Sequence, residues 1–231
     1  MNFTDSIIIL LRQNFREADR MVSVYTLEHG RMALRFPGVN KAASRLKALS
    51  EPFTHSTARI YIRRNAAIGC VTGGKIEAVY PNIRADFKKT GLALFCCELF
   101  HKLTPEHNPN QDKFLLLQTA LEQLETGAYN HAFAPAFLLR LMQLSGFGLQ
   151  DAPVLDIDAD FWQTLHTAPL GRLNFLEEKE IAGINKARYV CQRFLNRCLD
   201  YPLNTAAQLE LTAPIEIEEA IMETALEPQA V

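Results

Sequence analysis

The chain has 231 residues, of which 48% are hydrophobic, and its formal net charge is -2 at pH 7. This length and apolar content suffice for one large or two small packed cores, so a wholly disordered chain is excluded. The early apolar run at residues 7–11 is flanked by charged residues, and no stretch reaches the roughly 18 to 20 apolar residues of a membrane helix. We therefore expect a cytoplasmic protein without a signal peptide.

The charges are distributed unevenly along the chain. Residues 1–80 hold twelve Lys and Arg against six Asp and Glu, whereas the remainder holds twelve against twenty. An asymmetry of this size suggests that the N-terminal part faces a polyanion, although scattered surface charge is the alternative.

Short strand-like segments occupy the chain up to about residue 76. Residues 6–12 and 21–27 are apolar and rich in β-branched side chains. Residues 31–36 and 59–63 alternate, so that their basic residues share one face and their apolar residues the other. Five short strands with a basic outer face are typical of an OB-fold barrel, and residues 40–50 predict a short helix or a long loop between strands.

Beyond residue 81 the apolar period becomes helical. We expect helices at residues 82–103, 113–126, 134–144, 159–166 and 177–200. The predicted fold class is α+β, with an N-terminal five-stranded OB-fold β-barrel followed by an all-α helical domain. The expected domains are 1–80, 81–211 and an acidic, flexible tail at 212–231.

Residues 69–76 carry the G-x-x-x-x-G-K spacing of a phosphate-binding loop. Ile76 replaces the hydroxyl residue that would bind magnesium, and Pro81 leaves no room for the long helix that should follow. We therefore predict a turn at Gly73-Gly74 between two barrel strands instead of a nucleotide site.

Other catalytic and metal-binding patterns are incomplete. Asp156, Asp158 and Asp160 resemble the start of a calcium loop, but Phe161 stands where glycine is required. The cysteines lack the paired spacing of a zinc site and the pattern of a disulfide framework, which favours core packing in a reducing compartment. Because no local signature of a nucleophile or of an acid–base pair is present, we expect no enzyme activity, no metal and no cofactor.

The basic surface of the first segment is the feature that suggests a function. Lys and Arg neutralise phosphates without reading sequence, and an exposed aromatic ring can stack on a base. The candidate nucleic-acid-binding residues are Arg31, Arg35, Lys41, Arg45, Lys47, Arg59, Tyr61 and Arg63.

Several segments, spread over nearly the whole chain up to about residue 209, occur in the same order and spacing as in a known protein family. They are residues 7–12, Glu17, Asp19-Arg20, residues 22–26, Gly30, residues 38–44, Leu46-Lys47, Pro52-Phe53, Glu98-Leu99, Phe114, Leu121, residues 137–141, Gly146-Phe147 and Leu203-Asn204-Thr205. In order and spacing these segments resemble the RecO family of recombination mediators. Pro37 and Asn40 replace a lysine and an arginine of that family, and the zinc-binding cysteines that many members carry after residue 146 are absent, as in its zinc-free branch.

The resemblance implies a non-catalytic DNA repair protein associated with the nucleoid. It implies binding of single- and double-stranded DNA and annealing of strands coated with single-strand-binding protein. It also implies cooperation with RecR in loading RecA. The helical domain would contact the acidic C-terminal tail of single-strand-binding protein, with Arg140 as a candidate contact if it is exposed.

Two other classes of function stay open at this point. An OB-fold RNA-binding or protein-docking module would share the fold but not the annealing activity, and a preference for RNA would identify an RNA-binding module. An enzyme with a site built from residues far apart in the sequence would turn over nucleotides or DNA.

Overall fold

The computed structural model describes residues 1–41, 44–147, 158–179, 181–199 and 203–205. The chain divides into two compact units, Met1–Tyr129 and the part from Asn130 onward. The change from strands to helices falls at the expected boundary after residue 80, but the first unit continues beyond it because three helices belong with the barrel. The expected domain limits stay a prediction, and the acidic tail lies outside the described residues.

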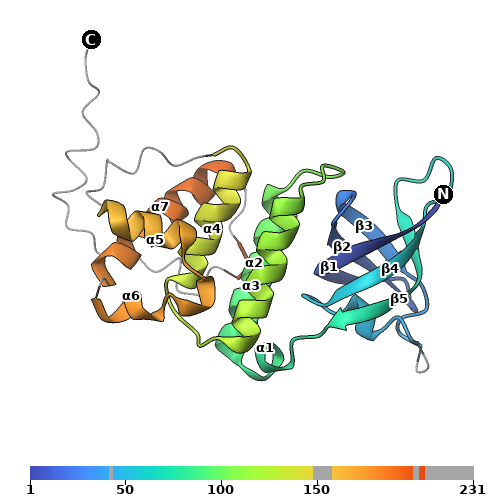
Figure 1. Cartoon of the computed structure of the whole chain (residues 1–231). Helices are drawn as coiled ribbons and strands as arrows, with labels where there is room; N and C mark the ends of the chain where they lie inside the picture. Colours follow the sequence, from blue (N-terminus) through green and yellow to red (C-terminus); the bar gives the residue numbers. More distant parts are fainter. Residues whose placement is uncertain (42–43, 148–157, 180, 200–202, 206–231) are drawn as a thin grey trace, which may run out of the picture. The chain divides into compact units, whose positions relative to one another are not determined.

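The first unit begins with five strands that form a closed barrel (Figure 1). The strands are β1 Asn2–Phe15, β2 Asp19–Thr26, β3 Gly30–Phe36, β4 His55–Tyr61 and β5 Gly69–Ala78. Their order around the barrel is β1-β2-β3-β5-β4, with β3 and β5 parallel and the other pairs antiparallel. This is the five-stranded arrangement of an OB-fold, which confirms the predicted fold class.

Alternation of side chains decides which face of each strand lies inside the barrel. Along β3 every second residue is buried, and Met32, Leu34 and Phe36 point into the core as predicted. The barrel interior is filled by apolar side chains from all five strands and from the segment after β3. The outward-facing residues of the same strands are therefore free to form a surface.

Gly73 and Gly74 lie inside β5, so the predicted Gly-Gly turn is wrong. They pair with Arg59 and Ala58 on β4 next to an irregularity in the register. A Cβ atom on Gly74 would lie 2.6 Å from the carbonyl oxygen of Thr57, so the two backbones approach too closely for a side chain. The pair of glycines marks a close strand contact that a sequence pattern does not distinguish from a turn.

Three helices follow the barrel in the first unit: α1 Pro81–Ala85, α2 Phe87–Leu103 and α3 Gln111–Thr126. The single helix expected at residues 82–103 is interrupted at Asp86. Its side chain caps α2 by accepting hydrogen bonds from the main-chain N–H groups of Lys88 and Lys89. Figure 1 shows α2 beside the barrel and α3 next to α2. The edge of the Tyr25 ring packs against Phe100, which joins β2 to α2.

The second unit contains α4 Phe133–Leu144, α5 Ala159–Thr167, the 3-10 turn η3 Leu170–Arg172, α6 Asn174–Lys179 and α7 Ile181–Cys198. The segment expected as one helix at 177–200 thus falls on α6 and α7, with residue 180 outside the described part. α4 packs against α5 and α7. Within the described residues, no helix combines the length and the apolar character needed to cross a membrane.

Candidate nucleic-acid interface

A continuous row of outward-facing residues runs around the outside of the barrel. Strand register places Gln13 opposite Met21, Met21 opposite Arg35, Arg35 opposite Cys70, and Cys70 opposite Tyr61. Partners in adjacent strands lie about 5 Å apart and point to the same side of the sheet. These five residues, which we call the barrel row, bring Arg35 and Tyr61 onto one surface although they are distant in sequence.

Arg35 lies in the middle of the barrel row and is 40% exposed. Its guanidinium is 3.7 Å from a carboxylate oxygen of Asp19 and 4.0 Å from the sulfur of Cys70. An exposed ion pair of this length contributes at most about 1 kcal/mol, so a phosphate can take the place of Asp19 at little cost.

Arg59 and Tyr61 extend this surface along β4. Both are exposed, with 42% of Tyr61 accessible, and Ile60 between them is buried as the alternation predicts. Arg59 lies over Gly73, because a Cβ there would come within 2.7 Å of the guanidinium. Arg63 is also exposed but lies beyond the end of β4, in the loop that leads to β5.

Lys41, Arg45 and Lys47 are exposed on the segment between β3 and β4, which forms a loop with a short 3-10 turn at Ala48–Ser50. Asn40 anchors this loop to the β1–β2 turn, since its main-chain N–H donates to Ala18 and its side chain donates to the carbonyl of Glu17. Asn40 therefore positions the loop where the RecO pattern has an arginine, and the basic charge lies on the residues that follow.

Arg31 was expected to face solvent, but its side chain is mostly buried. Only 16% of it is exposed, and its guanidinium donates to the carbonyl oxygen of Thr104 at 2.7 Å and to Glu106 at 3.1 Å. It ties β3 to the segment after α2. Because the guanidinium of Arg31 is already hydrogen-bonded and ion-paired within the protein, Arg31 has a structural role in this fold.

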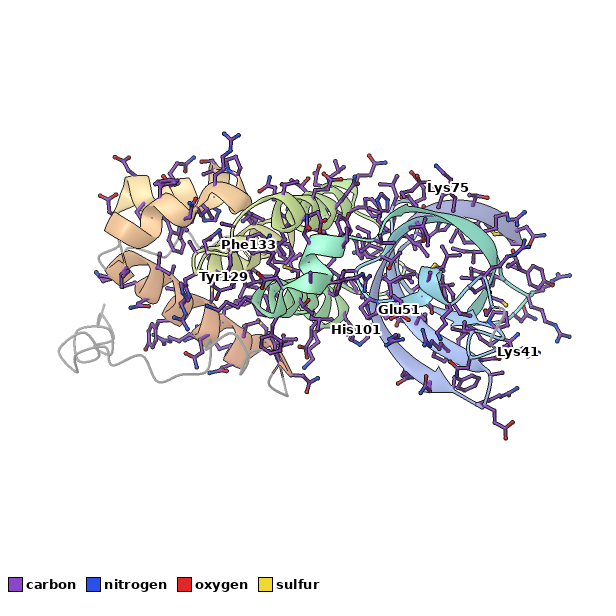
Figure 2. All side chains as sticks on the ribbon, turned by 90° about the horizontal axis from the view of Figure 1, so that it is seen from below. Lys41, Glu51, Lys75, His101, Tyr129 and Phe133 are labelled. Atoms are coloured by element: carbon purple, nitrogen blue, oxygen red, sulfur yellow. The ribbon has the colours of Figure 1, made fainter. Side chains whose placement is uncertain are left out.

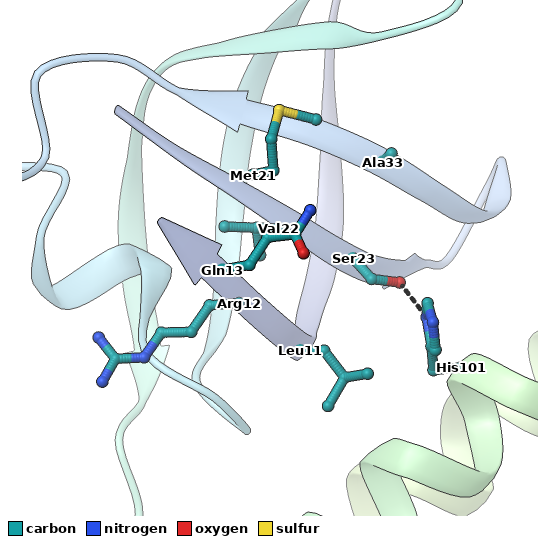
Figure 3. Close-up of a pocket in the computed structure, with 8 residues that line it drawn as sticks. All are labelled: Leu11, Arg12, Gln13, Met21, Val22, Ser23, Ala33 and His101. Atoms are coloured by element: carbon teal, nitrogen blue, oxygen red, sulfur yellow. Dashed lines mark hydrogen bonds between the residues drawn. The ribbon is translucent and has the colours of Figure 1, made fainter. Parts of the chain in front are cut away.

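A pocket of about 360 Å³ adjoins the barrel row on the outer face of β1, β2 and β3 (Figure 3). Leu11, Met21 and Ala33 supply apolar surface. At one end Ser23 and the imidazole of His101 form a hydrogen bond of 2.9 Å. Burial, assisted by the nearby cations Arg31 and Lys102, lowers the pKa of His101, so its imidazole is neutral at physiological pH.

The sequence patterns missed four exposed basic residues of the barrel: Arg12 on β1, which pairs with Glu51, Arg16 in the β1–β2 turn, Arg64 in the β4–β5 loop, and Lys75 on β5. OB-folds bind oligonucleotides with the face of strands 2 and 3 and with these two loops. That rule was the signal for Arg16 and Arg64, because both lie between predicted strands. Lys75 and Lys41 lie apart on the barrel, so the exposed basic residues do not all belong to one cluster (Figure 2).

Arg140 on α4 does not meet the condition of exposure on which its proposed partner contact depends. Its guanidinium donates to the carbonyl oxygens of Leu165, at 2.7 and 2.9 Å, and of Ala168. Burial lowers the pKa of Arg140 to about 10, so it stays charged near neutral pH. The contacts tie α4 to the end of α5, which is a structural role.

Metal-binding groups do not gather in the described part of the chain. No set of three or more His, Cys, Asp or Glu side chains there is arranged to hold an ion. Asp158 caps α5 by accepting from the N–H of Phe161 at 2.9 Å, and Asp156 lies outside the described residues. Cys96, Cys97 and Cys191 are buried, and burial raises the pKa of each thiol.

Residues 1–80 match the family described as "Recombination protein O N terminal", and residues 84–150 match "Recombination protein O C terminal". The chain belongs to the RecO family.

Relatives named DNA repair protein RecO support this assignment. The chain is 33% identical over 149 residues to the one from Pelotomaculum thermopropionicum, covering 64% of this chain and 56% of the relative. It is 32% identical over 120 residues to the one from Geobacter metallireducens, covering 52% and 48%. It is 32% identical over 149 residues to the one from Bacillus pumilus, covering 64% and 56%. Each match thus spans about half of the relative's length.

The boundary between the two RecO matches falls at the end of the barrel. The first ends at residue 80, where the barrel ends, and the second covers α2, α3 and α4. α5, α6 and α7 lie outside both matches, so the matches indicate no role for these helices.

Proposed function

We propose that this protein is a non-catalytic recombination mediator in DNA repair. It binds single- and double-stranded DNA, anneals complementary strands coated with single-strand-binding protein, and with RecR assists the loading of RecA in the bacterial cytoplasm. The names of its RecO relatives support a role in DNA repair. The observation that carries the proposal is the barrel row, which joins Arg35 and Tyr61 on one outer surface with Arg59 beside them.

Annealing has physical requirements that this surface meets. Two strands repel each other through their phosphates, and exposed Lys and Arg reduce that repulsion without reading sequence. The bases must stay available for pairing. The barrel row carries a single aromatic ring, Tyr61, and one stacking contact of roughly 1 to 3 kcal/mol can hold a strand and still release it.

The test is annealing of complementary oligonucleotides precoated with single-strand-binding protein, over a series of salt concentrations. We expect the protein to accelerate annealing without nucleotide and to lose this effect as salt rises, because counterion release drives the contact. The variant Arg35→Glu/Arg59→Glu should abolish the acceleration. Arg31 is left unchanged, since its reversal would break the contacts to Thr104 and Glu106.

The matched control is Lys88→Glu/Lys89→Glu, which makes the same change of charge at the start of α2, outside the barrel row. Acid residues in the first turn of a helix also favour its dipole, so this control should fold and anneal normally. If the wild-type protein fails to accelerate annealing at low salt, the proposal is wrong. A preference for RNA would then support an RNA-binding module, and binding of neither nucleic acid a protein-docking one.

A further inference from the structure

The last helix of the second unit has an unusual charge composition. α7, at Ile181–Cys198, contains four Lys and Arg residues and no Asp or Glu. Surface helices usually mix both signs, because pairs of opposite charge three or four residues apart stabilise them. Arg193 and Arg197 instead form a like-charge pair at that spacing, which destabilises the helix slightly. The helix thus carries positive charge that nothing within its own length compensates.

The buried face of α7 is well defined. Ile184, Ala187, Cys191 and Leu195 are buried at spacings of three and four residues, the period of one helix face. The thiol of Cys191 lies 3.7 Å from the carbonyl oxygen of Pro135 on α4. Packing against its neighbours therefore fixes which side of α7 is turned away from solvent.

Three of the four basic residues lie on the opposite side, whereas Arg188 lies next to the buried face. Lys186, Arg193 and Arg197 are separated by seven and four residues, and with 3.6 residues per turn they align along one face with Tyr189. Arg193 and Arg197 are exposed, and Lys186 and Tyr189 are partly exposed. These four residues, which we call the α7 stripe, face away from the buried side.

The length and chemistry of the α7 stripe fit a chain of phosphates. From the first to the last of its basic residues the helix rises about 16 Å, whereas a duplex places one phosphate per strand about every 3.4 Å. The guanidinium of Arg193 lies over the ring of Tyr189 at 5.8 Å from its centre, which restrains a donor suited to phosphate. A single small anion would need only one of these cations.

We propose that the α7 stripe is a second phosphate-binding surface for nucleic acid, separate from the barrel row, and that it holds the second strand during annealing. This inference rests on the proposed function, because a mediator of annealing has to accept two strands. It is independent of the RecO matches, which end before α7.

The experiment counts strands bound per chain. Full-length protein is titrated at low salt with a 12-nucleotide single-stranded oligonucleotide that cannot pair with itself, and stoichiometry is read by calorimetry. We expect two strands per chain for the wild type and one for Arg193→Glu/Arg197→Glu. We expect one for Arg35→Glu/Arg59→Glu as well, and none when both pairs are reversed.

The controls separate charge from folding. Arg172→Glu reverses one arginine at an exposed residue of the second unit outside α7, and it should keep two strands per chain. Because glutamate near a helix C-terminus is unfavourable, Arg193→Gln/Arg197→Gln serves as a second variant. It should also bind one strand, with the circular dichroism and urea midpoint of the wild type.

Each outcome decides between the two proposals. One strand per chain in the wild type, lost in Arg35→Glu/Arg59→Glu, would overturn the role of α7 and keep the proposed function. Two strands per chain in both α7 variants would also overturn it, because the second strand would then bind outside the α7 stripe. If the wild type binds no oligonucleotide at all, both proposals are wrong.

Discussion

Tyr61 is the one aromatic member of the barrel row, and its ring is 42% exposed. If it stacks on a base, Tyr61→Ala should weaken binding of a short single strand by roughly 5- to 150-fold, the equivalent of about 1 to 3 kcal/mol. Binding of duplex should change little, since duplex bases are already stacked. Fluorescence anisotropy with both labelled substrates measures the difference.

The control for this effect is Tyr61→Phe, which keeps the ring and removes only an exposed hydroxyl. We expect it to bind single strands as the wild type does. Equal losses in the alanine and phenylalanine variants, or equal losses on single-stranded and duplex DNA, would contradict stacking at this position.

Adjacent glycines on β5 should respond differently to the same substitution. Gly74→Ala places a methyl group 2.6 Å from the carbonyl oxygen of Thr57, so the β4 backbone has to shift. We expect a loss of about 1 to 3 kcal/mol in the free energy of unfolding, measured by urea denaturation. In Gly73→Ala the close atom belongs to the flexible end of Arg59, which can move away, so stability should be nearly unchanged.

Gly73→Ala should instead reduce DNA affinity, because it displaces the Arg59 guanidinium from its place beside the barrel row. Comparing the two variants therefore distinguishes a contact between two backbones, at Gly74, from a contact with a mobile side chain, at Gly73. Equally small losses of stability in both variants would show that the close approach of β4 and β5 relaxes easily at either position.

Strands and helices differ in how far the sequence predicts them. Residues 31–36 were predicted correctly because one local alternation decides both the strand and its buried face. The Gly73-Gly74 segment was misread because its requirement comes from Thr57 on another strand. The contacts of Arg31 and Arg140 could not be predicted for the same reason, since their partners lie 25 or more residues away in the sequence.

Segment charge was likewise only a partial guide to the candidate sites. The excess of Lys and Arg in residues 1–80 pointed to the barrel, and eleven of those twelve residues lie outside its core. The acidic balance of the remainder concealed α7, where four basic residues and no acidic ones share a single helix. Charge has to be counted by element, because the helix face that a residue occupies decides whether it can meet a ligand.

Three half-buried histidines, in both units, make stability depend on pH. Burial is the largest cause that lowers the pKa values of His55, His101 and His166 from the usual 6.5. The folded protein therefore binds fewer protons than the unfolded chain once the pH falls below about 6.5. The free energy of unfolding should be constant above that pH and should decrease as the pH falls from 6.5 towards 5.

Urea-denaturation midpoints at pH 8, 7, 6 and 5 test this expectation. His101→Gln should flatten the decrease between pH 6.5 and 5, because it removes one group that the fold holds neutral while an amide can still pair with Ser23. A stability that rises as the pH falls through this range would mean that the histidines are held in their charged form, opposite to what their burial implies.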